Sequence, residues 1–339
     1  MFYLINLLAF VVRVLVAYVV YCAKKVNIRT ITFLLSLLVT VSGHAAPFAY
    51  SVNSDGPDSS TSDSLYVIDL ADGSAQIIGK VRPTENSINS DVEGLAFDID
   101  GVLYGVDDAD ETLLSINIGT GQATSVTGNA FNLQLGSGLV YDFGMTFTCE
   151  NTILVSSDQT QTLYRSDVGT PRAEVIGAQN ALVRPITGIA AWGDDVYGIG
   201  QGVNDSQQTL IPNLYRINST DGTATLIGAL GGLVAPYADA GLAFDEAGQL
   251  WALTDRSNFG AGGSASELVR IDHTTGTAQE VMQVDVVGFE SLAITRPGGC
   301  NNILPTNGPE GIPTTGKTGL LLLSLILAMV GVVQLRRYN

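Results

Sequence analysis

Between residues 47 and 300, short apolar segments alternate with tight turn signals. The segment GLAFDIDGVLYG (94–105) predicts an apolar strand, an Asp-Gly turn and a second apolar strand that carries an aromatic residue. Imperfect copies of it stand at 144–155, 188–199 and 241–252. A fifth copy (291–299) keeps only the first strand, and the missing second strand matches FAYSV (48–52) at the other end of the region.

A second hairpin motif alternates with the first and begins as SLYVIDLADGSAQIIG (64–79). Its leading leucine recurs at intervals of 48, 50, 51 and 54 residues, as Leu65, Leu113, Leu163, Leu214 and Leu268. Each unit therefore holds four short strands, named A to D here in chain order. No stretch of this region shows helical periodicity, so we expect it to be all-β.

Four strands per unit and a repeat of this length are typical of a β-propeller, in which each sheet buries its faces against its neighbours. Five units predict a five-bladed β-propeller over residues 47–297. The last unit ends after its strand A (291–295), and the chain begins with a strand B (48–52). Pairing of these two segments is expected to close the ring. The alternative architecture is a β-solenoid, whose repeats are usually shorter and more regular.

The connections between the predicted strands differ in length. The A–B and C–D turns are tight, whereas the B–C and D–A connections are long, as at 53–63, 255–266 and 229–240. In an antiparallel four-stranded sheet the long connections emerge on one face, here called the mouth face. The tight turns emerge on the opposite face, here called the tail face. Long loops on a rigid scaffold commonly bind ligands, so the mouth face is the expected working face.

The first 45 residues are expected to direct export. Residues 1–21 are almost wholly apolar, and a second apolar run (31–41) follows three basic residues and precedes SGHAA. A basic region, a short apolar core and small residues are typical of a secretory signal peptide, here cleaved after Ala45. One alternative is a two-helix membrane anchor. Another is a translation start near Val26, which would leave the preceding residues outside the protein.

The other end of the chain predicts a linker and a membrane span. Residues 298–316 are rich in Pro, Gly and Asn without a regular pattern, which is typical of a linker. The apolar segment 319–335 precedes Arg336 and Arg337. Residues 317–339 are therefore expected to form a transmembrane helix with a basic cytoplasmic tail.

A short motif precedes this apolar segment and consists of Ile312, Pro313, Thr314, Thr315 and Gly316. The motif, the apolar helix and the terminal basic pair together resemble the IPTL-type sorting signal of Gram-negative surface proteins. They are also similar to the LPxTG signal cut by sortases. Thr315 stands where the first pattern has Leu, and Ile312 stands where the second has Leu.

The resemblance implies a processing protease as a partner, with cleavage between Thr315 and Gly316 if that protease is sortase-like. It also implies a protein that is held at the cell surface or released outside the cell. The alternative is a plain membrane anchor at the tail. The repeats themselves resemble uncharacterised secreted bacterial propellers with LYxID…TGxA repeats, and this resemblance implies no activity.

Charge restricts the partners of the chain. There are 33 acidic and 16 basic residues, and residues 46–311 keep nine basic residues against all 33 acidic ones, a net charge of −24. Such a domain repels phosphate backbones and attracts cations, so no nucleic-acid partner is expected. The expected partners are the membrane, through the C-terminal helix, and a surface protein or glycan.

Few residues of the chain could build a nucleophile or a zinc site. After signal cleavage His273 is the only histidine, in a turn on the tail face, which excludes histidine-based zinc sites and argues against a Ser-His-Asp triad. Cys149 and Cys300 both follow a strand A and so belong to the tail face. An even pair of cysteines in a secreted chain suggests a disulfide, and two free thiols are the alternative.

Four acidic residues stand at the start of the strands that are predicted to line the propeller axis: Glu93, Asp142, Asp239 and Glu290. We expect their side chains to converge at the channel mouth, where they could bind a ligand, hold Ca²⁺ or act as an acid/base pair. The acidic loops 54–63 and 107–111 could hold Ca²⁺ as well. The alternative is that these carboxylates cap loop amides and face solvent.

These observations favour a surface-displayed binding or adhesion module with no catalysis of its own and no required cofactor. The rival hypothesis is a secreted glycan hydrolase that uses two of the four carboxylates. That chemistry needs two carboxyl groups about 5 to 9.5 Å apart, in a cleft large enough for a sugar. The geometry of the channel mouth therefore separates the two hypotheses.

Overall fold

The computed structural model describes residues 47–83, 91–108, 111–129, 142–169, 172–200 and 212–300, and the regular elements among them are all strands. The predicted signal peptide, sorting motif and transmembrane helix lie outside these residues. No helix in the described ranges is long and apolar enough to cross a bilayer.

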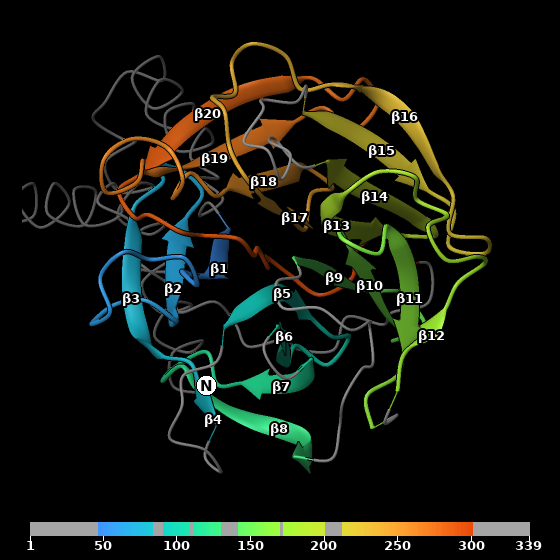
Figure 1. The fold of residues 1–339 in the computed structure, drawn as a ribbon, viewed down its shortest axis with the longest axis horizontal. Coiled ribbons are helices and arrows are strands. Elements are labelled where there is room, and N and C mark those ends of the chain that lie inside the picture. Colours follow the sequence, from blue (N-terminus) through green and yellow to red (C-terminus); the bar gives the residue numbers. More distant parts are fainter. Residues whose placement is uncertain are drawn as a thin grey trace, which may run out of the picture. The chain divides into compact units, whose positions relative to one another are not determined.

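Five sheets follow one another around a central axis in chain order, which confirms the predicted five-bladed, all-β propeller (Figure 1). Sheet 1 consists of β1 (Phe48–Val52), β2 (Ser64–Asp69) and β3 (Ala75–Lys80). Sheet 2 consists of β4 (Arg82–Pro83), β5 (Val92–Phe97), β6 (Leu103–Asp107), β7 (Thr112–Ile116) and β8 (Gln122–Asn129). Sheet 3 consists of β9 (Phe143–Phe147), β10 (Ile153–Ser157), β11 (Thr162–Ser166) and β12 (Glu174–Val175). Sheet 4 consists of β13 (Ile186–Trp192), β14 (Asp195–Gly200), β15 (Asn213–Ile217) and β16 (Ala224–Ala229), and sheet 5 of β17 (Ala240–Phe244), β18 (Leu250–Thr254), β19 (Ser266–Ile271) and β20 (Ala278–Val284).

The apolar core lies between neighbouring sheets. The strands nearest the axis are β5, β9, β13 and β17, which are the predicted A strands (Figure 1). All residues of β9 and β17 are buried, whereas every residue of the outermost strand β16 is partly buried or exposed. Inner strands pack against a sheet on each face, so they carry continuous apolar runs. Outer strands keep one side in water.

Glycine at one repeated position lets the innermost strands approach each other closely. A Cβ atom at Gly188 of β13 would lie 2.2 Å from the Ala240 carbonyl oxygen of β17. A Cβ atom at Gly241 of β17 would lie 2.3 Å from the Leu292 amide nitrogen. These separations leave no room for a side chain, so the repeated glycine keeps the axis of the propeller narrow.

Strand β4 was not predicted from the sequence. It lies in the connection that leads from sheet 1 to sheet 2, and it pairs in parallel with the outer strand β8, Arg82 opposite Gln122. Pairing covers an edge strand that would otherwise present free backbone groups to other chains.

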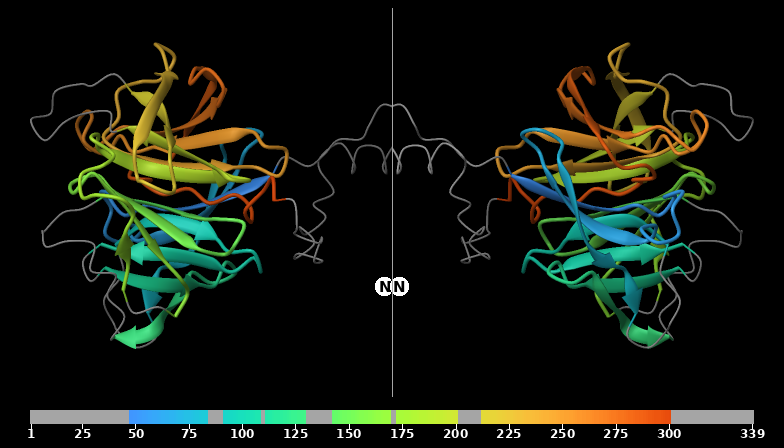
Figure 2. Two further views of the ribbon diagram at one scale, coloured as in Figure 1. Left: turned by 90° about the vertical axis from the view of Figure 1, so that its right-hand side faces the viewer. Right: turned by 90° about the vertical axis from the view of Figure 1, so that its left-hand side faces the viewer.

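The N-terminal strand and the C-terminal segment meet in sheet 1, side by side in both views of Figure 2. Tyr50 and Ala293 exchange two backbone hydrogen bonds, of 2.7 and 2.9 Å. Serine hydroxyls make the adjacent contacts: Ser51 Oγ donates to the Ser291 carbonyl (2.6 Å), and Ser291 Oγ accepts from the Val52 amide (3.2 Å). Residues 291–295 therefore do not form the regular strand that the sequence predicted, because side-chain bonds replace part of the backbone ladder.

After this bridge the chain crosses the tail face towards sheets 3 and 4. The Gly193 amide donates a hydrogen bond to the Gly298 carbonyl (2.8 Å). Cys300 forms a disulfide with Cys149, which follows strand β9, and their Cα atoms are 5.5 Å apart. The last described residues are thus held against the A–B turns of two other sheets.

Candidate functional site: the channel mouth

The four acidic residues predicted at the channel mouth come together in the structure. Glu93 lies in β5, Asp142 and Asp239 immediately precede β9 and β17, and Glu290 precedes the bridge of sheet 1. Glu93 and Glu290 lie within hydrogen-bonding reach of each other, and so do Asp142 and Asp239. Two carboxyl groups at such a distance favour sharing one proton, because like charges in contact cannot both ionise easily.

Burial sets the protonation of this group. Glu93, Asp239 and Glu290 expose only 6%, 8% and 6% of their surface. Burial raises the pKa of Glu93 well above its usual range, and the nearby Asp142 carboxylate raises it further. Burial likewise raises the pKa of Asp239 and Glu290, with further contributions from Asp142 and Glu93 respectively.

The structure adds aspartates that the sequence analysis did not single out. Asp91 precedes β5, and Asp255 directly follows β18. Both pKa values are raised to about 7, mainly by burial. These residues belong to a repeated arrangement in which the residue after strand B donates its amide to the carbonyl of the residue before strand A. The three pairs are Asp108 to Asp91 (2.9 Å), Asp158 to Asp142 (3.2 Å) and Asp255 to Asp239 (2.7 Å).

The repeats of the sequence contain a pattern that indicates these residues. The second strands of three units each end in an aspartate, at VDD (106–108), SSD (156–158) and LTD (253–255). In an antiparallel hairpin the end of strand B lies beside the start of strand A. An aspartate at both positions of one unit therefore places two carboxyl groups together at the mouth face.

Two separate groups of three carboxylates are each compact enough to hold a cation. The carboxylate oxygens of Asp55, Asp255 and Glu290 lie within 4.8 Å of one another, and the same holds for Asp91, Glu93 and Asp108. Asp55 and Asp108 belong to the acidic loops that the sequence marked as Ca²⁺ candidates.

Backbone packing explains why Asp55 reaches the other carboxylates. Gly288 has a φ of +84°, and a Cβ atom there would lie 2.3 Å from the Asp55 carbonyl carbon. Only glycine allows both this conformation and this approach. The loop that carries Asp55 therefore lies directly on the segment that carries Glu290.

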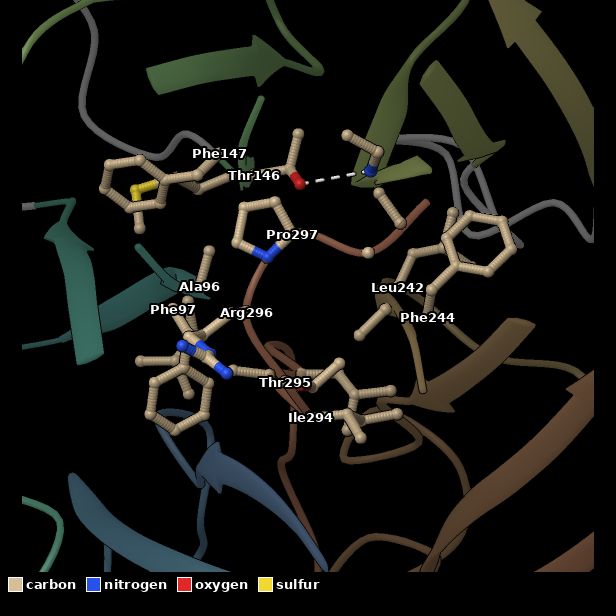
Figure 3. A pocket seen from close by; sticks show the side chains of 18 residues that line it. Ala96, Phe97, Thr146, Phe147, Leu242, Phe244, Ile294, Thr295, Arg296 and Pro297 are labelled. Atoms are coloured by element: carbon tan, nitrogen blue, oxygen red, sulfur yellow. Dashed lines mark hydrogen bonds between the residues drawn. The ribbon is translucent and has the colours of Figure 1, made fainter. Parts of the chain in front are cut away.

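Between the described inner strands, little free space lies behind the carboxylates. A cavity of about 10 Å³ between the innermost strands, lined in part by Glu93, Gly144 and Ser291, has room for about one water molecule. At the tail end of the axis a cavity of about 30 Å³ is lined mainly by apolar side chains, among them Phe97, Phe147 and Phe244 (Figure 3). Thr146 Oγ1 accepts a hydrogen bond from the Ala191 amide there (3.1 Å). Neither space would hold a sugar ring.

His273 takes no part in this site. Its ring packs edge-on against Tyr197 and Phe244, with ring centroids 5.5 and 5.7 Å away. Phe244 ends β17 and lines the tail-end cavity, whereas Asp239 stands at the opposite end of the same strand. The arrangement places the histidine on the tail face, as the sequence predicted.

Two family models match the chain, one over its repeats and one over its C-terminal tail. A model described as a repeat of unknown function (DUF6923) matches residues 50–195. The IPTL-CTERM motif matches residues 311–337, which confirms the predicted type of sorting signal. The chain is thus a repeat β-propeller that carries the C-terminal motif of secreted, surface-sorted proteins. No curated protein matches the chain.

Three of the solved structures that match the chain are distant in sequence. The chain is 12% identical to hydrazine synthase of Kuenenia stuttgartiensis, with a TM-score of 0.36, over 61% of this chain and 53% of that one. It is 13% identical to a chain of a nidogen/laminin complex, with a TM-score of 0.44, over 74% and 99%. A Bacteroides thetaiotaomicron protein of unknown function is 15% identical, with a TM-score of 0.39, over 56% and 50%. The chain spans about half the length of the first and third of these, and such distant similarities say nothing about its ligand.

Proposed function

We propose that the chain is a binding module displayed at the cell surface, which engages a protein or glycan ligand at its mouth face without catalysis of its own. The observation that carries the proposal is the group of buried carboxyls at the channel mouth, arranged in contacting pairs over a cavity with room for one water molecule. A negative mouth of this kind favours ligands that present cationic groups.

The glycan-hydrolase hypothesis finds no support in this geometry. A glycosidase holds its two carboxyl groups about 5 to 9.5 Å apart, so that a sugar and in some enzymes a water fit between them. Within each pair described here the carboxyls lie within hydrogen-bonding reach, and the space behind them is too small for a sugar ring.

Cell-surface sorting is supported by the match to the IPTL-CTERM motif. We propose that residues 1–45 export the chain, that residues 317–339 anchor it in the membrane, and that a protease processes the motif at 312–316. A stop codon at position 312 tests the anchor: fractionation should then find the propeller in the medium. Unchanged retention at the surface would refute it.

We also propose that the pairing of 48–52 with 291–295 closes the ring of sheets. The two Tyr50–Ala293 hydrogen bonds and the Ser51–Ser291 contact support this proposal.

A binding assay with matched variants tests the binding function. The full chain in detergent is immobilised and screened against a glycan array and a panel of lysine-rich peptides. Asp55→Asn changes an exposed carboxylate at the mouth, and Glu246→Gln changes an exposed carboxylate in an A–B turn on the tail face. The mouth variant should lose most of the binding, and the tail variant should keep it.

Equal loss in both variants would place binding elsewhere. Release of sugars by the wild-type chain, abolished by Glu93→Gln or Glu290→Gln, would instead establish the hydrolase.

A further inference from the structure

We propose that Asp55, Asp255 and Glu290 bind one Ca²⁺ ion at the channel mouth. Their carboxylate oxygens lie within 4.8 Å of one another. Two Ca²⁺–oxygen bonds of about 2.4 Å span the same distance, so one ion placed among the three residues could touch all of them. This inference does not depend on the identity of the ligand, because an ion can bind whether or not a ligand is present.

A buried oxygen without a partner provides the second observation. Asp239 is only 8% exposed, and its Oδ1 atom has no hydrogen-bond partner among the described residues. The side chain lies close to Glu290 and contacts Asp142. An unsatisfied buried carboxylate oxygen is costly, and a cation beside it removes that cost.

No salt bridge found among the described residues reaches these carboxylates. The four salt bridges found in the described part of the chain join Arg165 to Glu174, Arg216 to Asp195, Arg256 to Glu267 and Arg270 to Glu280. Arg256 follows Asp255 directly, yet its guanidinium group contacts Glu267 and the carbonyls of Pro236 and Ala265. Buried anions need protons or a bound cation when no basic group is present.

Serine side chains orient the three proposed ligands. Ser257 Oγ lies 2.8 Å from Asp255 Oδ2 and 3.0 Å from Asp55 Oδ2. The Ser257 amide donates to Asp255 Oδ1 (2.9 Å), and Ser54 Oγ donates to Glu290 Oε2 (2.8 Å). Hydrogen bonds of this kind fix the direction of a carboxylate before the metal arrives.

The ligand chemistry selects Ca²⁺ among divalent cations. The donors are carboxylate oxygens, which suit hard cations, and no histidine or free thiol lies with them. Mg²⁺ keeps several of its waters and is usually bound by only one or two carboxylates, so a site of three carboxylates suits it less well. Ca²⁺ accepts six to eight oxygens in irregular geometry, so water can complete the site.

Titration calorimetry on the full chain in detergent, stripped of metal with a chelator, tests the site. CaCl₂ should bind and raise the melting temperature, and MgCl₂ should bind more weakly. Asp255→Asn and Glu290→Gln should each weaken Ca²⁺ binding by more than about tenfold. Asp55→Asn should do the same without risk to the fold, because Asp55 is exposed.

Two control variants make the result specific. Glu174→Gln changes an exposed carboxylate on the outer strand β12 and should leave Ca²⁺ binding unchanged. Asp91→Asn changes the other carboxylate group and should weaken Ca²⁺ binding much less than Asp55→Asn does, because Asp91 acts on Asp55 only through its charge. Absence of Ca²⁺ binding at millimolar CaCl₂ would overturn the proposal. Loss of binding in Asp91→Asn, with binding retained in Asp55→Asn, would overturn the placement of the ion.

Discussion

The two ends of the propeller axis use aspartate in opposite ways. On the tail face Asp245 Oδ1 accepts hydrogen bonds from the Ala247 and Gln249 amides, both 2.9 Å, and Oδ2 accepts one from Trp251 Nε1 (3.0 Å). At the mouth Asp239 is equally buried, but it contacts another carboxyl and keeps one oxygen without a partner. Residue type and burial alone therefore do not say whether a carboxylate stabilises the fold.

Aspartates at the two ends of the axis also differ in the direction of their pKa shift. Hydrogen bonds from the Thr274 side chain and backbone lower the pKa of Asp272 in a tail-face turn, whereas burial raises the pKa of Asp239. A carboxyl group whose pKa is raised by burial is typical of a functional site. A carboxylate that accepts several hydrogen bonds is typical of a structural one. Asp245 therefore stabilises the tail face, whereas Asp239 costs stability at the face where we propose binding.

Deleting residues 47–52 should have the largest effect, because it removes β1 and the bridge to Ala293 that we propose closes the ring. We expect complete loss of cooperative unfolding in a circular dichroism melt. Deletion of residues 301–311, which removes no described contact, is the control. A truncated chain that melts like the full chain would contradict ring closure by this strand.

Removing the disulfide tests the structural role of the tail face. The bond joins residues 151 positions apart, and loss of such a bond typically costs about 2–5 kcal/mol of unfolding free energy. The double variant Cys149→Ser, Cys300→Ser should lower the unfolding free energy by this amount, as measured by urea denaturation. Its Ca²⁺ affinity should stay unchanged, since the bond lies on the opposite face. A large loss of Ca²⁺ affinity would show that the two ends are coupled.

The stability of the metal-free chain should fall as the pH rises. The pKa of Asp91 in the folded state is raised to about 7, by burial and by Asp108, Asp63, Asp55 and Asp107. A raised carboxyl pKa favours folding while the group is protonated, so its contribution is present below the unfolded value near 3.8 and is lost as the pH rises through about 7.

The loss that Asp91 contributes should be on the order of 3 kcal/mol, allowing for its partial exposure. Urea midpoints between pH 5 and pH 8 in a chelator measure it. Asp91→Asn should make the fall with pH shallower, and the other buried carboxyls at the mouth should supply what remains. A profile that rises with pH would contradict this assignment.

Paired substitutions at Asp245 and Asp239 should give the smallest effects, of opposite sign. Asp245→Ala leaves two amides and the indole N–H without their acceptor and should cost about 2–3 kcal/mol. Asp239→Asn removes a buried ionisable group and should raise the melting temperature of the metal-free chain at pH 8. Thermal melts of both variants against wild type measure the two signs. Destabilisation by Asp239→Asn without Ca²⁺ would remove the distinction between the faces.

Much of this architecture could be predicted from periodicity, because every unit repeats the same apolar alternation. The positions of Glu93, Asp142, Asp239 and Glu290 followed from their place at the starts of inner strands. Asp91 and Asp255 did not, because their role depends on which residues lie opposite each other at the ends of a hairpin. The serine contacts that replace part of a strand at 291–295 were also beyond reach, because they join residues 239 and 240 positions apart.

The disulfide also decides how the propeller would bear mechanical load. In a chain held by its C-terminal tail, tension enters the described fold at Cys300 and passes through the covalent bond to Cys149, in the turn after β9. The Tyr50–Ala293 bridge, with only two backbone hydrogen bonds, lies on the other side of that attachment and is shielded from the pull. A ligand drawn away from the surface would thus strain sheet 3 before it could peel apart the segment where the two ends of the propeller meet.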